Sequence, residues 1–145
     1  MIEYKIIILP LVASLLAQIL KFIIRTNKLK FSRKNLIAYS GMPSGHSAMT
    51  IGLSTIIGLE LGLKSPIFAL SVFFALLTLR DAMGLRQYLG KHGELINDLV
   101  EDLDEDKMLD RKYPMLLEKL GHSFVQVFIG GLIGFLVSYL GYLYW

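Results

Sequence analysis

The sequence predicts an all-helical, polytopic membrane protein in which four helices cross the bilayer as one bundle. Three observations support this fold class. The chain has 145 residues, about the length of one domain, 54% of them are hydrophobic and only 19% are charged. The mean hydropathy is +0.54. A soluble domain of this size could not bury so much apolar surface, which excludes disordered, fibrous and ordinary cytosolic proteins. We therefore expect residues 1–145 to form one integral membrane domain.

Four apolar segments are long enough to be membrane spans, because a helix needs about 20 residues to cross the hydrocarbon core. These segments are residues 5–24, 46–63, 66–82 and 122–145. The first lacks the small-residue cleavage site of a secretory signal, so we expect it to be retained. Only two residues separate the second and third segments, which predicts a tight helical hairpin.

The long polar connection between the third and fourth spans, residues 83–121, predicts an amphipathic helix at residues 93–110. Its apolar stripe consists of Leu95, Ile96, Leu99, Val100 and Leu103 on an otherwise acidic segment. We expect this helix to lie on the cytoplasmic surface of the membrane.

An alternative for this segment is a divalent-metal site built from Asp102, Asp104 and Asp106. The segment departs from the EF-hand pattern, because Lys107 and Tyr113 stand where that pattern requires Gly and Glu. The absence of cysteine also excludes a disulfide framework, a thiolate metal site and a cysteine nucleophile.

The distribution of basic residues predicts the orientation in the cell membrane. Thirteen of the 15 Lys and Arg residues lie in two connections, residues 21–45 and 80–121, and the other two are Lys5 and Lys64. Because Lys and Arg collect on the cytoplasmic side of spans, we expect both connections inside and both termini outside. A net charge of +3 could also indicate a nucleic-acid partner, but these basic residues lie between apolar runs, so we expect none.

Polar residues recur along one stripe of the first span. Ser14, Gln18, Lys21 and Arg25 are spaced by four, three and four residues, which places them on one helical face. A lysine at the end of a span is also typical of a snorkelling anchor. Gln18 lies one turn deeper, where a buried amide requires a partner.

The second span begins with a sequence that favours an anion. Ser44 is a good N-cap residue, and Gly45 leaves the backbone of the first turn accessible. The free N–H groups and the dipole at a helix start attract negative charge. His46 would lie at the rim of this anion site. The simpler interpretation, a capped helix start, does not explain a histidine at the membrane boundary.

The third and fourth spans contribute further charged and polar groups at the same face. Arg80 and Arg86 flank the end of the third span, and guanidinium groups bind oxyanions in pairs of hydrogen bonds. An interfacial ion pair with Asp81 is the alternative. His122 and Gln126 are four residues apart at the start of the fourth span. Two histidines and several cations are the groups that phosphoryl transfer requires.

Several motifs, in chain order along nearly the whole sequence, resemble the divergent branch of the type 2 phosphatidic acid phosphatase superfamily. The resemblance implies an all-helical membrane protein with metal-independent phosphatase chemistry and no cofactor. The motifs are Ala17-Gln18-x-x-Lys21, Gly41-Met42-Pro43-Ser44-Gly45-His46-Ser47-Ala48, Arg80-Asp81-Ala82-x-Gly84-x-Arg86, Gly90-Lys91, Leu95-x-Asn97, and Leu120-Gly121-His122-Ser123 with Gln126-Val127.

The resemblance also implies roles for individual residues. His46 corresponds to the general acid of the superfamily, and Ser44 and Gly45 to the residues that hold phosphate. His122 takes the place of the histidine that attacks phosphorus and becomes phosphohistidine. Lys21 corresponds to a lysine that binds phosphate.

Two departures from the superfamily pattern concern the orientation of the nucleophile. The chain has no Arg-Pro, and Gln126 stands where an Asp is expected after the nucleophilic histidine. His92 is a rival nucleophile, because Arg86 lies six residues before it. We expect either Asp81, across the bundle, or Gln126, through a hydrogen bond, to orient His122.

These residues and the resemblance predict a membrane phosphatase that acts on a lipid phosphate or diphosphate at the cytoplasmic face. Phosphatidate-like, phosphatidylglycerophosphate-like and polyprenyl phosphates are the candidate substrates. One alternative is a phosphoryl transferase of the same fold. Another is a non-catalytic oligomeric scaffold, because the spacings Gly58-x-x-x-Gly62 and Gly130-x-x-x-Gly134 permit close helix contacts and a homodimer.

Overall fold

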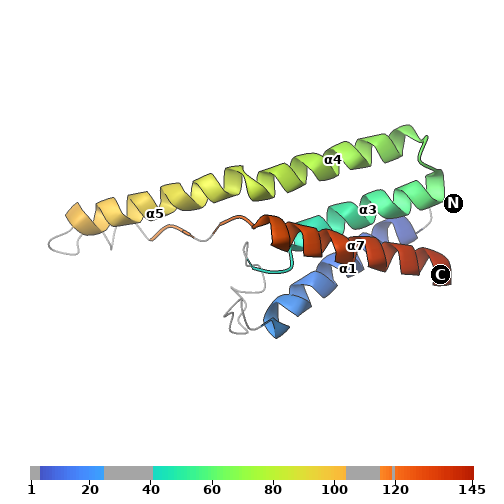
Figure 1. Ribbon diagram of the computed structural model, residues 1–145, viewed down its shortest axis with the longest axis horizontal. Coiled ribbons are helices and arrows are strands. Elements are labelled where there is room, and N and C mark those ends of the chain that lie inside the picture. Colours follow the sequence, from blue (N-terminus) through green and yellow to red (C-terminus); the bar gives the residue numbers. More distant parts are fainter. Residues whose placement is uncertain (1–3, 25–40, 104–114, 119) are drawn as a thin grey trace.

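The computed structural model of the chain describes residues 4–24, 41–103, 115–118 and 120–145. Within these residues every regular element is a helix, which confirms the all-helical prediction (Figure 1). The helices are α1 (Lys5–Ile23), α3 (Gly45–Leu61), α4 (Pro66–Met83), α5 (Leu85–Leu103) and α7 (Phe124–Tyr144). The four predicted apolar segments correspond to α1, α3, α4 and α7, and each boundary agrees within two residues.

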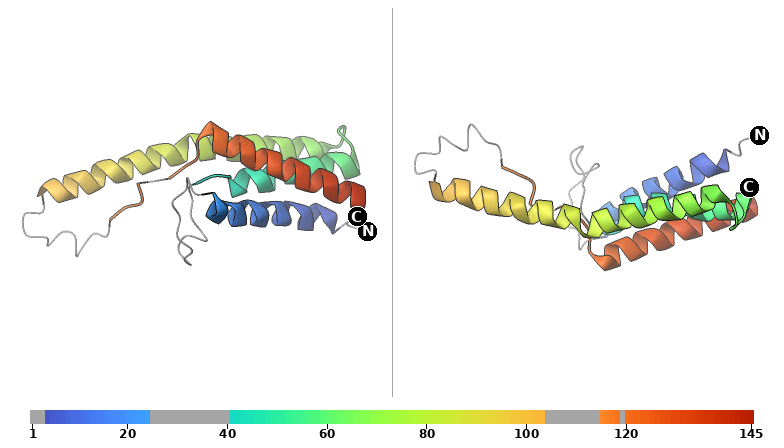
Figure 2. Two further views of the ribbon diagram at one scale, coloured as in Figure 1. Left: turned by 60° about the horizontal axis from the view of Figure 1, so that its bottom comes forward. Right: turned by 90° about the horizontal axis from the view of Figure 1, so that it is seen from above.

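The bundle is built around α3, which packs against α1, α4 and α7. The two chain ends lie at the same end of the bundle, as Figures 1 and 2 show from three directions. The hairpin between α3 and α4 lies at that end too. The last turns of α1 and α4 and the first turns of α3 and α7 therefore meet at the opposite end, which carries the predicted site.

Small residues bring α3 and α7 close together. A Cβ atom on Gly130 would collide with the carbonyl oxygen of Ser44, and one on Gly134 with that of Ala48. In lipid no hydrophobic effect drives helices together, so the van der Waals contacts that this close approach permits stabilise the pair. The Gly130-x-x-x-Gly134 spacing, which predicted a dimer contact, thus packs against α3 of the same chain.

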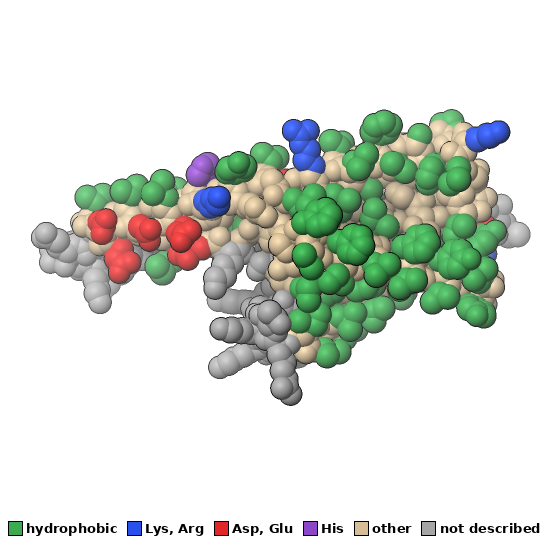
Figure 3. All heavy atoms as spheres, viewed as in Figure 1, with side chains coloured by type: hydrophobic (Ala, Val, Ile, Leu, Met, Phe, Trp, Pro, Cys, Tyr) green, Lys and Arg blue, Asp and Glu red, His purple; other side chains and the backbone are tan. Residues whose placement is uncertain are grey.

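The surface of the bundle is apolar, as expected for a protein surrounded by lipid. Hydrophobic side chains cover much of the face over α7 (Figure 3). Among the described residues, three helical stretches are long and apolar enough to cross a membrane: Lys5–Ile23, Pro66–Leu103 and Phe124–Tyr144. The remaining predicted span, α3, has 17 residues and lies between the others.

The helix in the long connection begins earlier than predicted. α5 starts at Leu85, directly after α4, and extends away from the bundle nearly in line with it (Figures 1 and 2). Its described part ends at Leu103, so residues 104–110 of the predicted helix lie outside the described residues. Four members of the predicted apolar stripe are exposed: Leu95, Ile96, Leu99 and Leu103. Gly90, Gly93 and Asn97 form the buried face instead.

Candidate functional site

Three helix ends bring several of the predicted phosphate-binding and catalytic residues to one end of the bundle. Lys21 lies in the last turn of α1, Ser44 caps α3, and His46 follows in the first turn of α3. His122 lies just before α7. The exposed fractions of Lys21, Ser44 and His122 are 3%, 0% and 2%, so these polar groups are buried rather than displayed on the surface.

Ser44 ties the start of α3 to the start of α7. Its side-chain oxygen accepts a hydrogen bond from the backbone N–H of Ser47 at 3.4 Å, which caps α3 as the sequence predicts. Its own backbone N–H donates to the carbonyl oxygen of Gln126 at 3.0 Å. These two bonds fix the first turn of α3 relative to the segment that carries His122.

The polar stripe of α1 lies against the same turn of α3. A Cβ atom on Gly45 would lie 3.5 Å from the hydroxyl oxygen of Ser14 and 3.6 Å from the side-chain nitrogen of Gln18. These are ordinary van der Waals distances, so the side chains of Ser14 and Gln18 lie against the first turn of α3. Gln18 thus lies at the end of the bundle that carries Ser44, and its supporting role stays a prediction.

Backbone hydrogen bonds hold His122 between α4 and α5. Its N–H donates to the carbonyl oxygen of Ala82 at 2.9 Å, and its carbonyl oxygen accepts from the side-chain amide of Gln87 at 2.7 Å. Gly121, at φ +87°, makes the turn into this position. A Cβ atom there would meet Gln87 at 2.8 Å, so only glycine suits both the left-handed backbone and the contact.

The imidazole of His122 has no hydrogen-bond partner among the described residues, although both ring nitrogens are buried. Burial lowers the pKa of His122 to about 4, and the charges of Lys21, His46 and Arg86 add to this effect. The ring is therefore neutral at pH 7. Buried polar atoms without a partner are rare in folded proteins and often belong to functional sites.

Asp81 pairs with Arg86 and not with a histidine. The Nε atom of Arg86 lies 2.6 Å from a carboxylate oxygen of Asp81, across the junction of α4 and α5. The charges of Arg86, Lys21 and Asp81 all interact electrostatically with His46. The structure thus places Arg86 near the two histidines.

The two groups expected to orient His122 have other partners. Asp81 pairs with Arg86, as described above. The side-chain oxygen of Gln126 accepts a hydrogen bond from the backbone N–H of Ser123 at 2.9 Å. Ser123 in turn accepts from the N–H of Gln126, which completes a capping box at the start of α7. His122 is instead positioned through its backbone.

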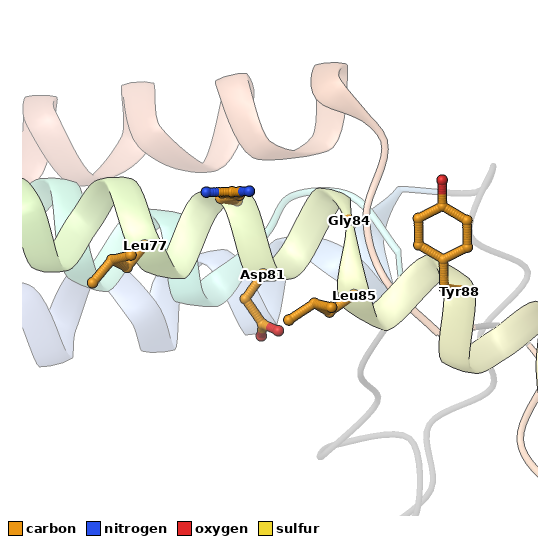
Figure 4. A pocket seen from close by; sticks show the side chains of 6 residues that line it. Leu77, Asp81, Gly84, Leu85 and Tyr88 are labelled. Atoms are coloured by element: carbon orange, nitrogen blue, oxygen red, sulfur yellow. The ribbon is translucent and has the colours of Figure 1, made fainter.

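Arg80 and His92 lie on other surfaces. Arg80 is exposed and lines a groove of about 460 Å³ beside Asp81, along the side of α4 and α5 where Leu77, Asp81 and Leu85 form a row (Figure 4). His92 is exposed on α5, which leads away from the bundle. The structure therefore brings Lys21, Ser44, His46, Arg86 and His122 together.

No group of three His, Asp or Glu residues that could hold a metal ion is found in the described part of the chain. Of the alternative metal site, Asp104 and Asp106 lie outside that part.

Two further residues, Ser47 and Gln87, also belong to this end of the bundle. The side-chain oxygen of Ser47 is fully buried and has no hydrogen-bond partner among the described residues. Gln87 holds the carbonyl of His122. Ser47 could have been found from the sequence, because it is a polar residue in the first turn of an apolar helix. Gln87 could not, because its contact depends on how α5 follows α4.

Comparison with known proteins agrees with the resemblance predicted from the motifs. Residues 2–137 match the family described as "Divergent PAP2 family". The chain is 38% identical over 140 residues to the Uncharacterized membrane protein YuiD of Bacillus subtilis (strain 168), with 88% of this chain and 87% of that protein covered. No solved structure matches the chain. Because the family match covers nearly the whole chain and every residue of the site, this membrane protein belongs to the Divergent PAP2 family.

Proposed function

We propose that this protein is a membrane-embedded phosphatase that hydrolyses a lipid phosphate or diphosphate through a phosphohistidine formed at His122. The observation that carries the proposal is the buried imidazole of His122, which has no hydrogen-bond partner within the described part of the chain and lies where four helices meet. Lys21 and Arg86 bring positive charge close to this ring, and His46 is near enough to act on it electrostatically. The family supports the same reaction class.

In the proposed first step, a ring nitrogen of His122 attacks phosphorus. The nitrogen–phosphorus bond forms as the bond from phosphorus to the lipid oxygen breaks, and His46 gives that oxygen a proton. The cations of Lys21 and Arg86 stabilise the non-bridging oxygens of the transition state. In the second step, water attacks the phosphohistidine, His46 accepts a proton, and phosphate leaves with His122 restored.

The start of α3 supplies the phosphate-binding donors in this proposal. The first backbone N–H groups of a helix have no partner within it, and here they belong to Gly45 and His46, because the N–H of Ser47 donates to the capping oxygen of Ser44. The hydroxyl of Ser44 adds a further polar group at the same turn. Because the ring nitrogens of His122 are buried, substrate binding must move a neighbouring side chain before phosphorus can reach them.

The same proposal includes four membrane spans with the site in the cytoplasmic leaflet. An even number of spans agrees with chain ends at one end of the bundle. The concentration of basic residues in the two long connections favours the cytoplasm for the opposite end, where the site lies. The apolar stripe of α5 is exposed, but contact with the membrane surface requires α5 to bend away from the line of α4, which it continues in this structure (Figure 1).

Phosphate release by the purified protein in detergent tests the function. Phosphatidate, phosphatidylglycerophosphate and polyprenyl phosphates form the substrate panel, assayed with and without a metal chelator. We expect release to continue in chelator, because protein cations take the place of metal ions at this site. Products formed in isotopically labelled water separate hydrolysis from transfer to another acceptor. Absence of release from every substrate would favour the scaffold alternative.

A further inference from the structure

An apolar groove of about 340 Å³ lies between α3, α4 and α7, and all nine residues that line it are apolar. It is lined by Leu79 and Met83 of α4, by Ile51 of α3 and by six residues of α7. This volume falls within the range of small-molecule sites. Several of the groove's α7 side chains are exposed, including Phe124 and Phe128, so the groove is open to the surrounding lipid.

One end of the groove adjoins the proposed catalytic residue. Met83 follows Ala82, whose carbonyl oxygen accepts the hydrogen bond from the N–H of His122. Phe124 lies two residues after His122 at the first turn of α7. Met83 and Phe124 both line the groove. The groove therefore begins beside the backbone of His122, which is not itself one of the lining residues.

The groove runs along α7 from Phe124 to Phe135. At 1.5 Å per residue this stretch of helix is about 16 Å long, roughly half the thickness of the hydrocarbon core. The groove is therefore an elongated channel directed from the site toward the middle of the bundle.

We propose that this groove binds one hydrocarbon chain of the lipid phosphate whose phosphoryl group reacts at His122. This inference rests on the proposed function and adds the subsite that recognises the length of the lipid. The chain enters sideways from the bilayer, because the groove opens on the lipid-facing surface. Its apolar contacts in the groove hold the phosphoryl group near His122 and so contribute binding energy remote from the reacting bond.

Gly131 sets the depth of the groove. A Cβ atom built at this position would lie 3.4 Å from a side-chain carbon of Ile51, and its other surroundings within 4 Å are open apart from that side chain. A larger side chain at Gly131 can therefore project into the groove without meeting backbone. Gly130, the preceding residue, has the opposite property, because a Cβ atom there would collide with the backbone of Ser44.

The test compares long-chain and short-chain substrates in Gly131→Leu. The two pairs are dioleoyl with dihexanoyl phosphatidate, and undecaprenyl with geranyl phosphate, so that acyl and prenyl chains are distinguished. We expect kcat/KM for the cleaved long-chain substrate to fall about tenfold or more, while that for its short-chain counterpart changes less than about twofold. Leu140→Phe, on an exposed part of α7 outside the groove, is the matched control. Equal losses on long and short chains would overturn the inference.

A second variant keeps the test decisive if Gly131→Leu does not fold. Phe135→Ala removes the aromatic ring at the far end of the groove and lengthens the channel. We expect it to shift the preferred chain length upward, whereas an unchanged chain-length profile would contradict the assignment.

Photo-crosslinking separates failure of this inference from failure of the proposed function. The probe is phosphatidate with a diazirine near the end of one acyl chain, and the readout is the labelled peptide. We expect labelling within residues 124–135 that unlabelled phosphatidate removes and phosphatidylcholine with the same chains does not. Equal competition by both lipids would identify an ordinary bilayer lipid and overturn the inference. Selective labelling without any phosphate release would retain the subsite and reject the phosphatase.

Discussion

Asn97 of α5 and Leu116 of the segment before α7 are joined by two reciprocal hydrogen bonds. The side-chain nitrogen of Asn97 donates to the carbonyl oxygen of Leu116 at 3.0 Å, and its side-chain oxygen accepts from the N–H of Leu116 at 2.9 Å. The same nitrogen also donates to a carboxylate oxygen of Glu118. Gly90 and Gly93 leave room for this segment, because Cβ atoms there would meet the carbonyl oxygens of Glu118 and Leu117. One face of α5 thus holds the chain that leads to His122.

Replacing Asn97 by Ala should therefore slow the reaction without weakening substrate binding. Loss of the paired hydrogen bonds costs about 1 kcal/mol for each bond and frees the segment before His122. We expect kcat to fall about tenfold with KM little changed, measured on the substrate identified in the panel. Asp98→Ala, at an exposed neighbouring position, is the control. A rise in KM with unchanged kcat would show that Asn97 acts on substrate binding instead.

Replacing His46 by Ala should discriminate between leaving groups. A general acid contributes about 10²–10⁴-fold to the rate when the leaving oxygen needs a proton, and much less when it departs unaided. We expect a large loss for a lipid phosphate and a small loss for an activated aryl phosphate. Equal losses on both substrates would assign His46 to phosphate binding alone.

Stability should depend on pH through His122. The pKa of His122 in the folded chain, about 4, lies below the ordinary histidine value of 6.5, so the unfolded chain binds the proton more tightly. Above pH 6.5 the ring is neutral in the folded and in the unfolded chain, so it costs no stability. As the pH drops from 6.5 toward 4, the unfolded chain binds the proton first, and the free energy of unfolding falls. The difference amounts to about 3 kcal/mol.

Thermal unfolding in detergent at a series of pH values measures this effect. We expect the loss of Tm between pH 6.5 and 4 to be smaller in His122→Ala than in the original protein. His92→Ala is the control, because His92 is exposed. Parallel Tm curves for the original protein and His122→Ala would contradict a buried neutral imidazole.

The orientation in the membrane can be measured by cysteine labelling, because the native chain has no cysteine. Lys64→Cys lies in the exposed hairpin between α3 and α4, and Asp102→Cys lies on the exposed face of α5. With an impermeant maleimide applied to intact cells, we expect Lys64→Cys to react and Asp102→Cys to react only after permeabilisation. The reverse pattern would move the site to the outer leaflet.

The sequence predicted the helices well because hydropathy and caps are local properties. Continuous apolar runs gave α1, α3, α4 and α7, and Ser44 was recognised as an N-cap from its position alone. The convergence of Lys21, Ser44, His46 and His122 also followed from the sequence, because alternating spans bring these four positions to one end of a bundle.

Partners that depend on helix rotation or tertiary contact could not be predicted in this way. Arg80 and Asp81 are adjacent, and only the packing at the junction of α4 and α5 decides that Asp81 pairs with Arg86 while Arg80 is exposed. Gln126 fitted a partner of His122 by spacing, but it completes the cap of α7. The bonds of Asn97 join residues 19 positions apart in the sequence.

The most direct test of the central claim is to locate the phosphoryl group on the enzyme during turnover. The protein is mixed with labelled substrate, quenched rapidly under alkaline conditions that preserve phosphohistidine, and mapped by fragmentation. We predict acid-labile phosphate on His122, its absence in His122→Ala, and its retention in His92→Ala. Phosphate on His92, or full activity in His122→Ala, would contradict the account.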